Sequence, residues 1–374
     1  MIKLLFLVES LRVGGAERSL TSLVKQLDKN KYDITILTIA DGGYFADVIK
    51  TIPGIKYRFL TSTRSTLIDK LKIKLIYRWL SPKLIYHLFI PKGFDSEVAF
   101  CEGLGTKIIG ASINRHAKHI AWIHTDLKEN NWPVNHGVFR DISEEIKCYR
   151  NFDTIVGVSD TVCNRLREFV DNKNITRIYN IVDADEIREK SLGPSKYNHS
   201  KDKFNIVSVG RLEHVKGYDR LINVAARLAN EGYDNFTLTI VGGGREYASL
   251  IDRIRKTGLE DIVTLTGMQP NPYSIIAGCD LFICPSRNEG FNIAIAEAMI
   301  LGLPVISTWC PGPNEILQEG KYGILCENSE AGIYNAIKAF LDDPSLKDKY
   351  SRLSLERQAM FKQDEILKQI NELI

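Results

Sequence analysis

Two glutamates with seven residues between them, Glu289 and Glu297, lie in the part of the chain best equipped for chemistry. The apolar run before them ends at Cys284 and predicts a buried strand, and residues 292–301 have the pattern of a helix. Gly290 allows a sharp turn between the two elements. We therefore expect one carboxylate on a strand-to-helix loop and the other further along the helix.

The start of this expected helix offers groups that bind anions. The first NH groups of a helix have no partner within it, and the helix dipole favours negative charge there. A loop carboxylate, these amides and a deeper carboxylate could hold a sugar, a diphosphate and a ribose in a row. The alternative is a surface acid and a helix acid of the kind that any α/β protein can carry. The amides concerned belong to Phe291, Asn292 and Ile293.

A second loop carries two cations. Arg211 and Lys216 follow residues 205–209, which have the composition of another buried strand. A guanidinium can bind phosphate oxygens through two parallel hydrogen bonds, and an ammonium adds a compact point charge. At the carboxyl end of a strand the two cations suit a diphosphate leaving group, although a pair of solvated basic side chains is the alternative.

Glycines interrupt the chain at the ends of other expected strands. Gly14 and Gly15 stand between a strand over residues 3–8 and a helix over residues 18–27, and Gly243 lies within a glycine run. Such positions let the backbone approach a ligand closely, although a plain tight turn explains them equally well. The Gly-x-Gly-x-x-Gly fingerprint of dinucleotide-binding domains is missing at Gly14 and Gly15.

His124 follows an expected strand over residues 119–123 and would face a ligand at the carboxyl edge of a sheet. It could contact a sugar or shape an acceptor site, and a structural histidine is the alternative. Asp183 and Asp185 form an Asp-x-Asp pair, which can hold a divalent ion, but they lie far in sequence from the phosphate motifs. We interpret them as structural and expect no metal site.

Strand-like and helix-like segments alternate along the whole chain, which favours parallel β-α units. The 374 residues suffice for two domains, and a polar stretch over residues 183–203 is where they would divide. We predict an N-terminal domain over residues 1–185, a C-terminal domain over residues 186–355 and a last helix over residues 356–374. The expected strands span residues 3–8, 33–39, 96–100, 119–123, 154–158, 205–209, 237–241, 263–266, 281–284 and 304–307.

Three of these motifs together resemble a known family. They are the Glu289 and Glu297 pair, the Gly-Gly-Ala-Glu segment that begins at Gly14, and the Gly-Arg…Lys-Gly segment around Arg211 and Lys216. In these features the sequence resembles the large family of retaining GT-B glycosyltransferases, the family 4-like enzymes also called glycosyl transferases group 1. The resemblance implies an α/β fold of two Rossmann-like domains with parallel sheets facing across a cleft. It also implies a C-terminal helix that crosses back to the first domain.

The resemblance implies roles for the candidate residues. Glu289 would hold the hydroxyls of the donor sugar, and Glu297 would accept hydrogen bonds from the ribose. The diphosphate would lie against Arg211, Lys216, Gly14, Gly15 and the helix start after Gly290, while Gly243 would line the nucleotide side and His124 the sugar side.

The resemblance also implies the reaction. A nucleoside-diphosphate sugar, most often a UDP-sugar in this family, would donate a sugar to a saccharide or lipid-linked saccharide in polysaccharide or glycolipid assembly. The two basic side chains would replace a metal, and no other cofactor is expected. Transfer would retain the anomeric configuration, because the acceptor hydroxyl would attack on the face from which the diphosphate departs. The resemblance is strong over residues 205–323 and weak over residues 49–118, where the acceptor would bind.

The composition is that of an ordinary globular protein, with 44% hydrophobic and 25% charged residues. A net charge of +3 argues against nucleic-acid binding. Seven cysteines without metal-site spacing suggest reduced thiols in a cytoplasmic protein. No apolar run is long enough to cross a bilayer.

The stretch from Arg64 to Lys92 predicts a basic amphipathic helix. Such a helix can lie on an anionic membrane, here the inner face of the cell membrane, or simply pack its apolar side on a sheet. Lys72 intrudes on the apolar side. The residues that would form the two sides are Lys70, Lys74 and Arg78 on one, and Ile68, Leu71, Leu75, Ile76 and Trp79 on the other.

Other functions fit parts of the sequence. A nicotinamide dehydrogenase could use Asp41 as a ribose-binding acid, but the glycine fingerprint counts against it. A GT-B-fold phosphorylase or epimerase is a closer alternative, although no distinctive lysine motif for pyridoxal phosphate is present. A non-catalytic, transferase-like binding subunit would not need all of its charged motif residues intact.

Overall fold

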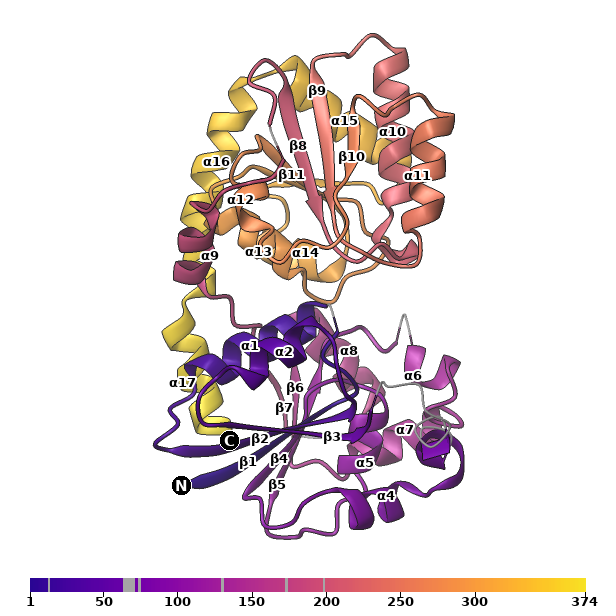
Figure 1. Cartoon of the computed structure of the whole chain (residues 1–374), viewed down its shortest axis with the longest axis vertical. Helices are drawn as coiled ribbons and strands as arrows, with labels where there is room; N and C mark the ends of the chain where they lie inside the picture. The colour runs from indigo at the N-terminus through magenta and orange to yellow at the C-terminus, as the bar shows by residue number, and fades with distance from the viewer. Residues whose placement is uncertain (13, 63–70, 73–74, 129–130, 172–173, 198) are drawn as a thin grey trace. The chain divides into compact units, whose positions relative to one another are not determined.

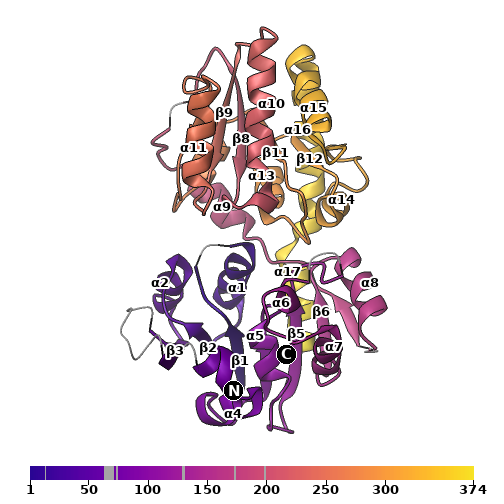
Figure 2. The same cartoon turned by 90° about the vertical axis from the view of Figure 1, so that its right-hand side faces the viewer.

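A computed structural model of the chain describes all residues except 13, 63–70, 73–74, 129–130, 172–173 and 198. The described residues form two compact units (Figures 1 and 2). Unit 1 comprises Met1–Ile181 and Gln363–Ile374, and unit 2 comprises Val182–Lys362. The last helix, α17 (Gln363–Leu373), therefore belongs to unit 1, where the hydroxyl of Tyr32 donates to Asn371 Oδ1 at 2.8 Å.

Unit 1 is built on a seven-stranded parallel sheet in the order β3-β2-β1-β4-β5-β6-β7. The inner strands are nearly continuous apolar runs, which is typical of a parallel sheet covered on both faces. The strands are β1 (Ile2–Val8), β2 (Tyr32–Ala40), β3 (Ile55–Thr61), β4 (Ser96–Ala99), β5 (Lys118–Ile123), β6 (Thr154–Gly157) and β7 (Ile175–Arg177).

Helices connect these strands. Polar side chains cap several of them, because the first NH groups of a helix need acceptors. Ser81, Asp141 and Ser159 do so for α4, α7 and α8. The helical segments are α1 (Gly15–Gln26), α2 (Tyr44–Lys50), the π-helical turn η1 (Leu75–Trp79), α4 (Pro82–Phe89), α5 (Leu104–Ile109), α6 (Trp132–Asn135), α7 (Ile142–Tyr149) and α8 (Asp160–Phe169).

Unit 2 is built on a six-stranded parallel sheet in the order β10-β9-β8-β11-β12-β13. Its strands are β8 (Phe204–Val209), β9 (Phe236–Val241), β10 (Val263–Leu265), β11 (Leu281–Cys284), β12 (Val305–Thr308) and β13 (Ile324–Cys326). Its helical segments are α9 (Ala184–Ser191), η2 (His214–Lys216), α10 (Tyr218–Asn230), α11 (Tyr247–Lys256), α12 (Tyr273–Ile276), α13 (Ile293–Ile300), α14 (Pro311–Ile316), α15 (Glu330–Asp342), α16 (Ser345–Arg357) and η3 (Gln358–Phe361).

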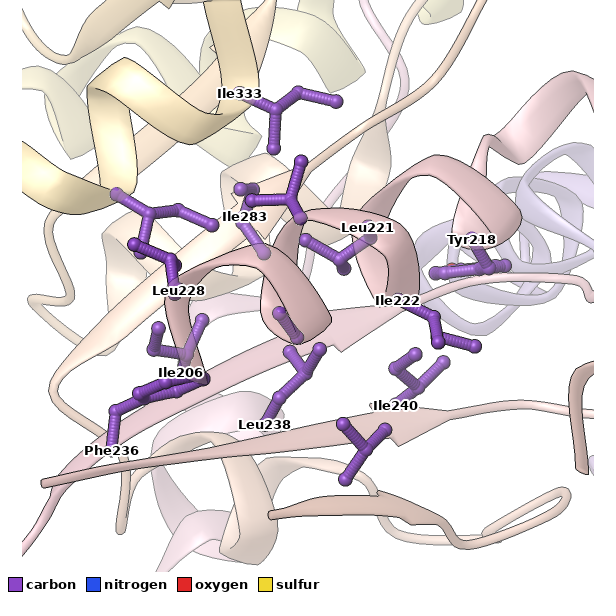
Figure 3. Packing of buried hydrophobic residues seen from close by; sticks show 14 of the residues in the cluster. Ile206, Tyr218, Leu221, Ile222, Leu228, Phe236, Leu238, Ile240, Ile283 and Ile333 are labelled. Atoms are coloured by element: carbon purple, nitrogen blue, oxygen red, sulfur yellow. The ribbon is translucent and has the colours of Figure 1, made fainter. Parts of the chain in front are cut away.

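The core of unit 2 lies between its sheet and the helices α10 and α15 (Figure 3). Leu221 and Leu228 of α10 are fully buried against this sheet, together with Leu238 of β9 and Ile333 of α15. Each such side chain contributes roughly 1.5–3 kcal/mol by leaving water. This packing holds the carboxyl ends of β8 and β11 in fixed positions.

The strand order reverses once in each sheet. In unit 1 the reversal lies between β1 and β4, and in unit 2 it lies between β8 and β11. In open parallel sheets, ligands bind outside the carboxyl ends of the strands at such a point. The loops after β8 and β11 are the ones that carry the predicted cations and Glu289.

The predicted α/β fold with two parallel sheets is confirmed, and each of the ten expected strands is present. Three strands were not predicted: β3, β7 and β13. In β3 the exposed, charged Lys56 and Arg58 hide the pattern, because this strand lies at the edge of its sheet. The other two strands are three residues long. β7 lies at the other edge of the unit 1 sheet, and β13 lies at one edge of the unit 2 sheet.

Much of the predicted basic amphipathic helix lies outside the described residues, including Ile68, Lys70 and Lys74. In the described part, Ile76 is buried whereas Leu75 and Trp79 are exposed. These three residues therefore do not share the one apolar side that the sequence predicted. Within the part of the chain that the structure describes, no helix is both long and apolar enough to cross a membrane.

Candidate active site

Two loops meet at the carboxyl edge of the sheet in unit 2. The NH of Arg287, on the loop after β11, donates to the carbonyl of Val215, on the loop after β8, at 2.7 Å. Gly217 has a φ of +71°, and a Cβ there would lie 2.1 Å from the carbonyl oxygen of Pro285. Only glycine tolerates both this conformation and this approach. The close contact brings Lys216 to the loop that carries Glu289.

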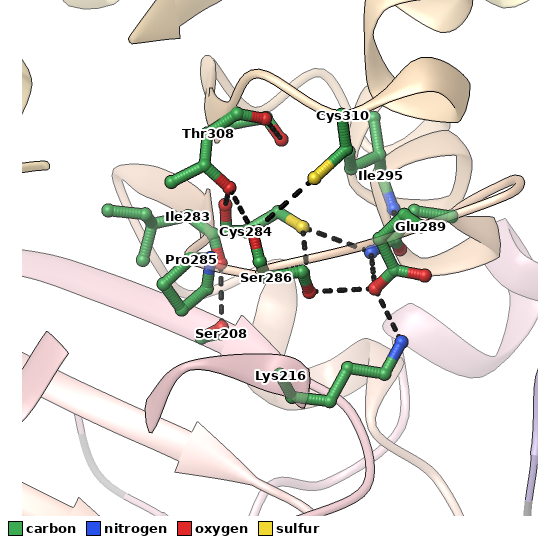
Figure 4. A network of polar contacts seen from close by, with 12 residues as sticks. Ser208, Lys216, Ile283, Cys284, Pro285, Ser286, Glu289, Ile295, Thr308 and Cys310 are labelled. Carbon is green, nitrogen blue, oxygen red and sulfur yellow. Dashed lines mark hydrogen bonds and ion pairs between the residues drawn. The ribbon is translucent and has the colours of Figure 1, made fainter. Parts of the chain in front are cut away.

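Glu289 is the centre of a polar network on these loops (Figure 4). Its side chain is 7% exposed, and its Oε1 forms an ion pair with Lys216 Nζ. The same oxygen accepts hydrogen bonds from Ser286 Oγ at 2.7 Å and from Asn292 Nδ2 at 3.0 Å. The structure thus brings together Glu289, Lys216 and Asn292, which the sequence nominated, and adds Ser286, which it did not.

The network is anchored in the sheet. Thr308 Oγ1, at the end of β12, donates to the carbonyl of Ser286 at 2.5 Å, and Ser208 Oγ of β8 donates to the carbonyl of Ile283 at 2.6 Å (Figure 4). These side chains hold the start of the loop after β11. Neither hydroxyl was predicted, since serine and threonine inside a strand carry no signal of a partner on another strand.

Helix α13 begins beside Glu289. Asn292 is its N-cap, and its Oδ1 accepts a hydrogen bond from the NH of Ile295 at 3.2 Å. The amides of Phe291, Asn292 and Ile293 lie at this start, as expected for an anion-binding helix terminus. The chain bends at Gly290, as predicted, although Gly290 is not among the residues with a positive φ.

Glu297 lies on α13, as predicted, and is 2% exposed. Its Oε1 accepts a hydrogen bond from the hydroxyl of Tyr273 at 3.1 Å. Tyr273 begins α12 and was not recognised in the sequence. A ribose that bound Glu297 would share this carboxylate with the tyrosine.

The two predicted cations differ. Lys216 pairs with Glu289, whereas Arg211 is exposed and its side chain has no hydrogen-bond or ion-pair partner among the described residues. Its guanidinium is therefore available to an anion. Arg287, on the loop after β11, does have a fixed partner, since its guanidinium binds both carboxylate oxygens of Asp219.

Close packing explains the glycines on either side of Gly243. A Cβ on Gly242 would lie 1.9 Å from the carbonyl oxygen of Gly210, and one on Gly244 would lie 2.3 Å from that of Leu212. Gly243 is different, since the nearest atom to its Cβ position belongs to Met268 at 3.7 Å. Packing within unit 2 therefore gives no reason for a glycine at this position.

The remaining nominated glycines and the histidine belong to unit 1. Gly14 is the N-cap residue of α1, which Gly15 begins, and a Cβ on Gly14 would meet the carboxylate of Glu17 at 2.2 Å. This acidic side chain lies at the helix start where the resemblance places a diphosphate. Because it is the flexible end of a side chain, it can move when an anion binds.

His124 follows β5 and lies beside Glu102. The backbone NH of His124 donates to Glu102 Oε2 at 2.9 Å, and Thr125 Oγ1 donates to Glu102 Oε1 at 2.9 Å. Burial lowers the pKa of His124 to about 4, against the opposing effects of Glu102 and the carbonyl of Phe100. The imidazole is therefore neutral at pH 7. Its Nε2 is buried and has no hydrogen-bond partner among the described residues.

Two further acids, one half-buried and one buried, accompany Glu102 at this edge of unit 1. Glu9, at the end of β1, accepts a hydrogen bond from the NH of Leu104 at 2.6 Å, and burial raises its pKa. Glu145 of α7 accepts one from Asn131 Nδ2 at 2.7 Å, and burial raises its pKa to about 7. Neither acid was predicted, because the two lie far apart in the sequence.

No group of three or more metal-binding side chains occurs among the described residues. Asp183 caps α9 by accepting a hydrogen bond from the NH of Glu186 at 2.9 Å, and Asp185 pairs with Arg188 at 3.2 Å. Both have the structural roles that we expected. None of the seven cysteines forms a disulfide bond.

Two family models match the chain. Residues 13–186 match the model described as Glycosyltransferase Family 4, and residues 190–357 match the model described as Glycosyl transferases group 1. Together the two models cover most of the chain and include every nominated residue of the candidate site.

Two bacterial proteins are among the relatives that match over most of the chain. The chain is 25% identical to the N-acetyl-alpha-D-glucosaminyl L-malate synthase of Bacillus anthracis over 89% of its length and 86% of that protein. It is 27% identical to the N-acetylgalactosamine-N,N'-diacetylbacillosaminyl-diphospho-undecaprenol 4-alpha-N-acetylgalactosaminyltransferase of Campylobacter jejuni, over 96% of each chain.

Solved structures share the fold. HepE of Anabaena, in complex with UDP and glucose, matches with a TM-score of 0.77 and 20% identity, over 100% of this chain and 99% of that one. Sucrose-phosphate synthase from Thermosynechococcus elongatus matches with a TM-score of 0.79 and 17% identity, over 100% and 98% of the two chains.

Proposed function

The chain belongs to the GT-B glycosyltransferases of the family 4-like type, and on this premise we propose that it transfers a sugar from a UDP-sugar with retention of the anomeric configuration. The acceptor is a saccharide or lipid-linked saccharide in polysaccharide or glycolipid assembly. The sugar is a hexose or an N-acetylhexosamine.

One observation carries the proposal. The ammonium of Lys216 lies on the carboxylate of Glu289 at the carboxyl edge of the sheet, beside the N-terminus of α13. A cation and the amides of a helix N-terminus favour a diphosphate, and a carboxylate next to them favours the hydroxyls of a sugar. A nucleoside-diphosphate sugar has these two parts in this order.

The relatives support the choice of donor and acceptor. The Bacillus and Campylobacter proteins are named for the transfer of N-acetylglucosaminyl and N-acetylgalactosaminyl groups, and the second name includes a diphospho-undecaprenol acceptor. The Anabaena structure contains UDP. These names favour a uridine nucleotide and a polyprenyl-linked saccharide here.

The proposed reaction breaks the bond between the anomeric carbon and the diphosphate oxygen, and negative charge builds on the diphosphate. Lys216, Arg211 and the amides at the start of α13 stabilise this charge in place of a metal. The acceptor hydroxyl attacks the anomeric carbon from the same face, and the departing diphosphate takes the hydroxyl proton. Glu289 orients the sugar, and no covalent intermediate forms.

Part of unit 1 favours contact with a membrane that carries such an acceptor. From Arg64 to Lys92 the sequence has seven Lys or Arg residues and one Asp. The exposed large apolar side chains in the described part of this stretch are Leu71, Leu75, Trp79, Leu84, Leu88 and Phe89. Exposed apolar side chains among basic ones suit the surface of an anionic membrane.

A panel of UDP- and GDP-sugars, assayed for release of the nucleoside diphosphate, tests the function. We expect slow hydrolysis of one UDP-sugar, a loss of about 100-fold in kcat for Glu289→Gln, and weaker UDP binding for Lys216→Ala. Lys201→Ala, at an exposed site, is the matched control. No turnover of any donor would favour a binding subunit, and turnover that requires inorganic phosphate would favour a phosphorylase.

A further inference from the structure

Three donors converge on one oxygen of Glu289. Lys216 Nζ, Ser286 Oγ and Asn292 Nδ2 all bind Oε1. Oε2 accepts no hydrogen bond from the described residues, and it is not among the buried atoms that lack a partner, so it is open to solvent (Figure 4). The carboxylate is thus held by one oxygen and presents the other.

One of the three donors is charged and two are neutral. A diphosphate attracts an ammonium more strongly than a single carboxylate does, because it carries more charge and more acceptor oxygens. When a donor binds as proposed above, Lys216 turns to the diphosphate. Glu289 then keeps only the hydrogen bonds from Ser286 and Asn292.

The amide of Asn292 has only one orientation that fits its surroundings. Its Oδ1 accepts from the NH of Ile295 and caps α13, so that its Nδ2 must face Glu289 and the thiol of Cys284, at 3.0 Å and 3.1 Å. A flipped amide would place an oxygen against the carboxylate and an NH₂ against the helix amide. The capping hydrogen bond to Oδ1 therefore fixes Nδ2 of Asn292 as the hydrogen-bond donor to Glu289.

We propose that Asn292, assisted by Ser286, is the positioning residue that keeps Glu289 aimed at the hydroxyls of the donor sugar once Lys216 has turned to the diphosphate. This inference rests on the proposed function. It gives the side chain of Asn292 a role in that reaction without contact with the substrate. An aspartate would cap α13 equally well, so the cap alone does not explain the asparagine.

Asn292→Asp separates the two roles, because it keeps the shape and the capping oxygen but places an anion against Glu289. At pH 8 we expect kcat for hydrolysis of the preferred UDP-sugar to fall by about 10- to 100-fold, since a hydrogen bond to a charged group is lost. Because the added anion lies against a buried carboxylate beside the proposed diphosphate site, UDP binding and the melting temperature should also fall at pH 8, so kcat is measured with saturating donor at a temperature where the variant is folded.

The pH profile distinguishes positioning from a purely structural role. Two adjacent carboxylates raise the pKa of one of them, so they share a proton at lower pH and regain a hydrogen bond. The activity of Asn292→Asp relative to the wild type should therefore rise as the pH falls from 8 to 6. Asn292→Ser, which keeps a capping oxygen but loses the amide NH₂ that faces Glu289, should lose kcat with no such rise.

Asn235→Asp, at an exposed site in the same unit, is the matched control and should behave as the wild type. If the wild type hydrolyses a donor and Asn292→Asp keeps its kcat at pH 8 within threefold, the positioning role is refuted while the proposed function stands. A loss of kcat together with an equal loss of UDP binding or of folding in both Asn292 variants would also refute it. If the wild type hydrolyses no donor, the proposed function fails and this inference fails with it.

Discussion

Arg287 and Asp219 form an ion pair with two hydrogen bonds, Nη1 to Oδ1 at 2.8 Å and Nη2 to Oδ2 at 2.7 Å. Arg287 lies on the loop that carries Glu289. Asp219 lies in the first turn of α10, the helix that begins directly after Lys216 and Gly217. The pair therefore joins the two segments whose side chains meet in the candidate site. Burial opposes the charge on Asp219, but the hydrogen bonds and charge of Arg287 hold its pKa below the ordinary value.

Arg287→Lys should loosen this connection, because an ammonium cannot make two parallel hydrogen bonds to a carboxylate. We expect kcat/KM for the donor to fall about tenfold and the free energy of unfolding to fall by about 1 kcal/mol at pH 7. Since the pKa of Asp219 is depressed in the folded state, its contribution is present above the unfolded pKa and disappears as the pH falls below it. Arg227→Lys, which alters the exposed pair with Glu231, is the control. Equal effects of the two variants on kcat/KM would contradict the connection.

Gly217→Ala tests the close approach of the two loops. The substitution combines a φ of +71° with a Cβ 2.1 Å from the carbonyl oxygen of Pro285, so the loops must separate. We expect a loss of about 2–4 kcal/mol in the free energy of unfolding by chemical denaturation, and weaker UDP binding.

The control for this substitution is Gly232→Ala. Its φ is +92°, but nothing lies within 4 Å of its Cβ position. It should lose only the roughly 1 kcal/mol that a left-handed alanine costs. A similar loss in both variants would mean that conformation, and not the contact with Pro285, explains the glycine at 217.

The long strands and the meeting of Lys216 with Glu289 could be predicted from the sequence. Buried parallel strands are continuous apolar runs, and the loops after neighbouring strands must lie side by side at one edge of the sheet. Of the three strands that are only three residues long, the same reasoning found β10 and missed β7 and β13.

Partners of polar side chains could not be predicted. Asp219 and Arg287 are 68 residues apart, and nothing in their neighbourhoods in the sequence links them. The roles of Ser286 and Asn292 depend on rotamers and on the backbone of one loop. Likewise, Gly242 is required by the carbonyl of Gly210 on another strand-to-helix loop, which a single glycine run does not indicate.

The exposed apolar side chains of unit 1 lead to a prediction about membranes. Trp79 and Leu88 are 72% and 58% exposed, and replacing both by glutamine removes apolar surface without changing charge. If they enter a membrane, binding to vesicles that contain phosphatidylglycerol should fall by tenfold or more in a sedimentation assay, since each buried side chain contributes about 2 kcal/mol. Leu192→Gln, at an 89% exposed leucine of unit 2, is the control. Unchanged sedimentation of the double variant would exclude this surface as the contact.

Glu145 makes unit 1 sensitive to pH. Its side chain is fully buried, its Oε1 has no hydrogen-bond partner among the described residues, and burial raises its pKa to about 7. The protein therefore folds most easily when this carboxyl group is protonated. Its contribution is fully favourable below the unfolded pKa of 4.5 and is lost as the pH rises through about 7.

Glu145→Gln, which imitates the protonated acid, should therefore stabilise the protein at alkaline pH. At pH 8 we expect the free energy of unfolding to rise by up to about 3 kcal/mol, and the gain should vanish near pH 4.5. The neighbouring Glu144 has a depressed pKa, because the hydrogen bond from the NH of Arg140 and the charge of Lys107 outweigh its partial burial. Glu144→Gln should have the opposite sign, a loss at pH 8 that shrinks as the pH falls. Denaturant titrations of unit 1 fluorescence at both pH values measure the two effects, and a loss at pH 8 in Glu145→Gln would show that this carboxylate is held in its charged form.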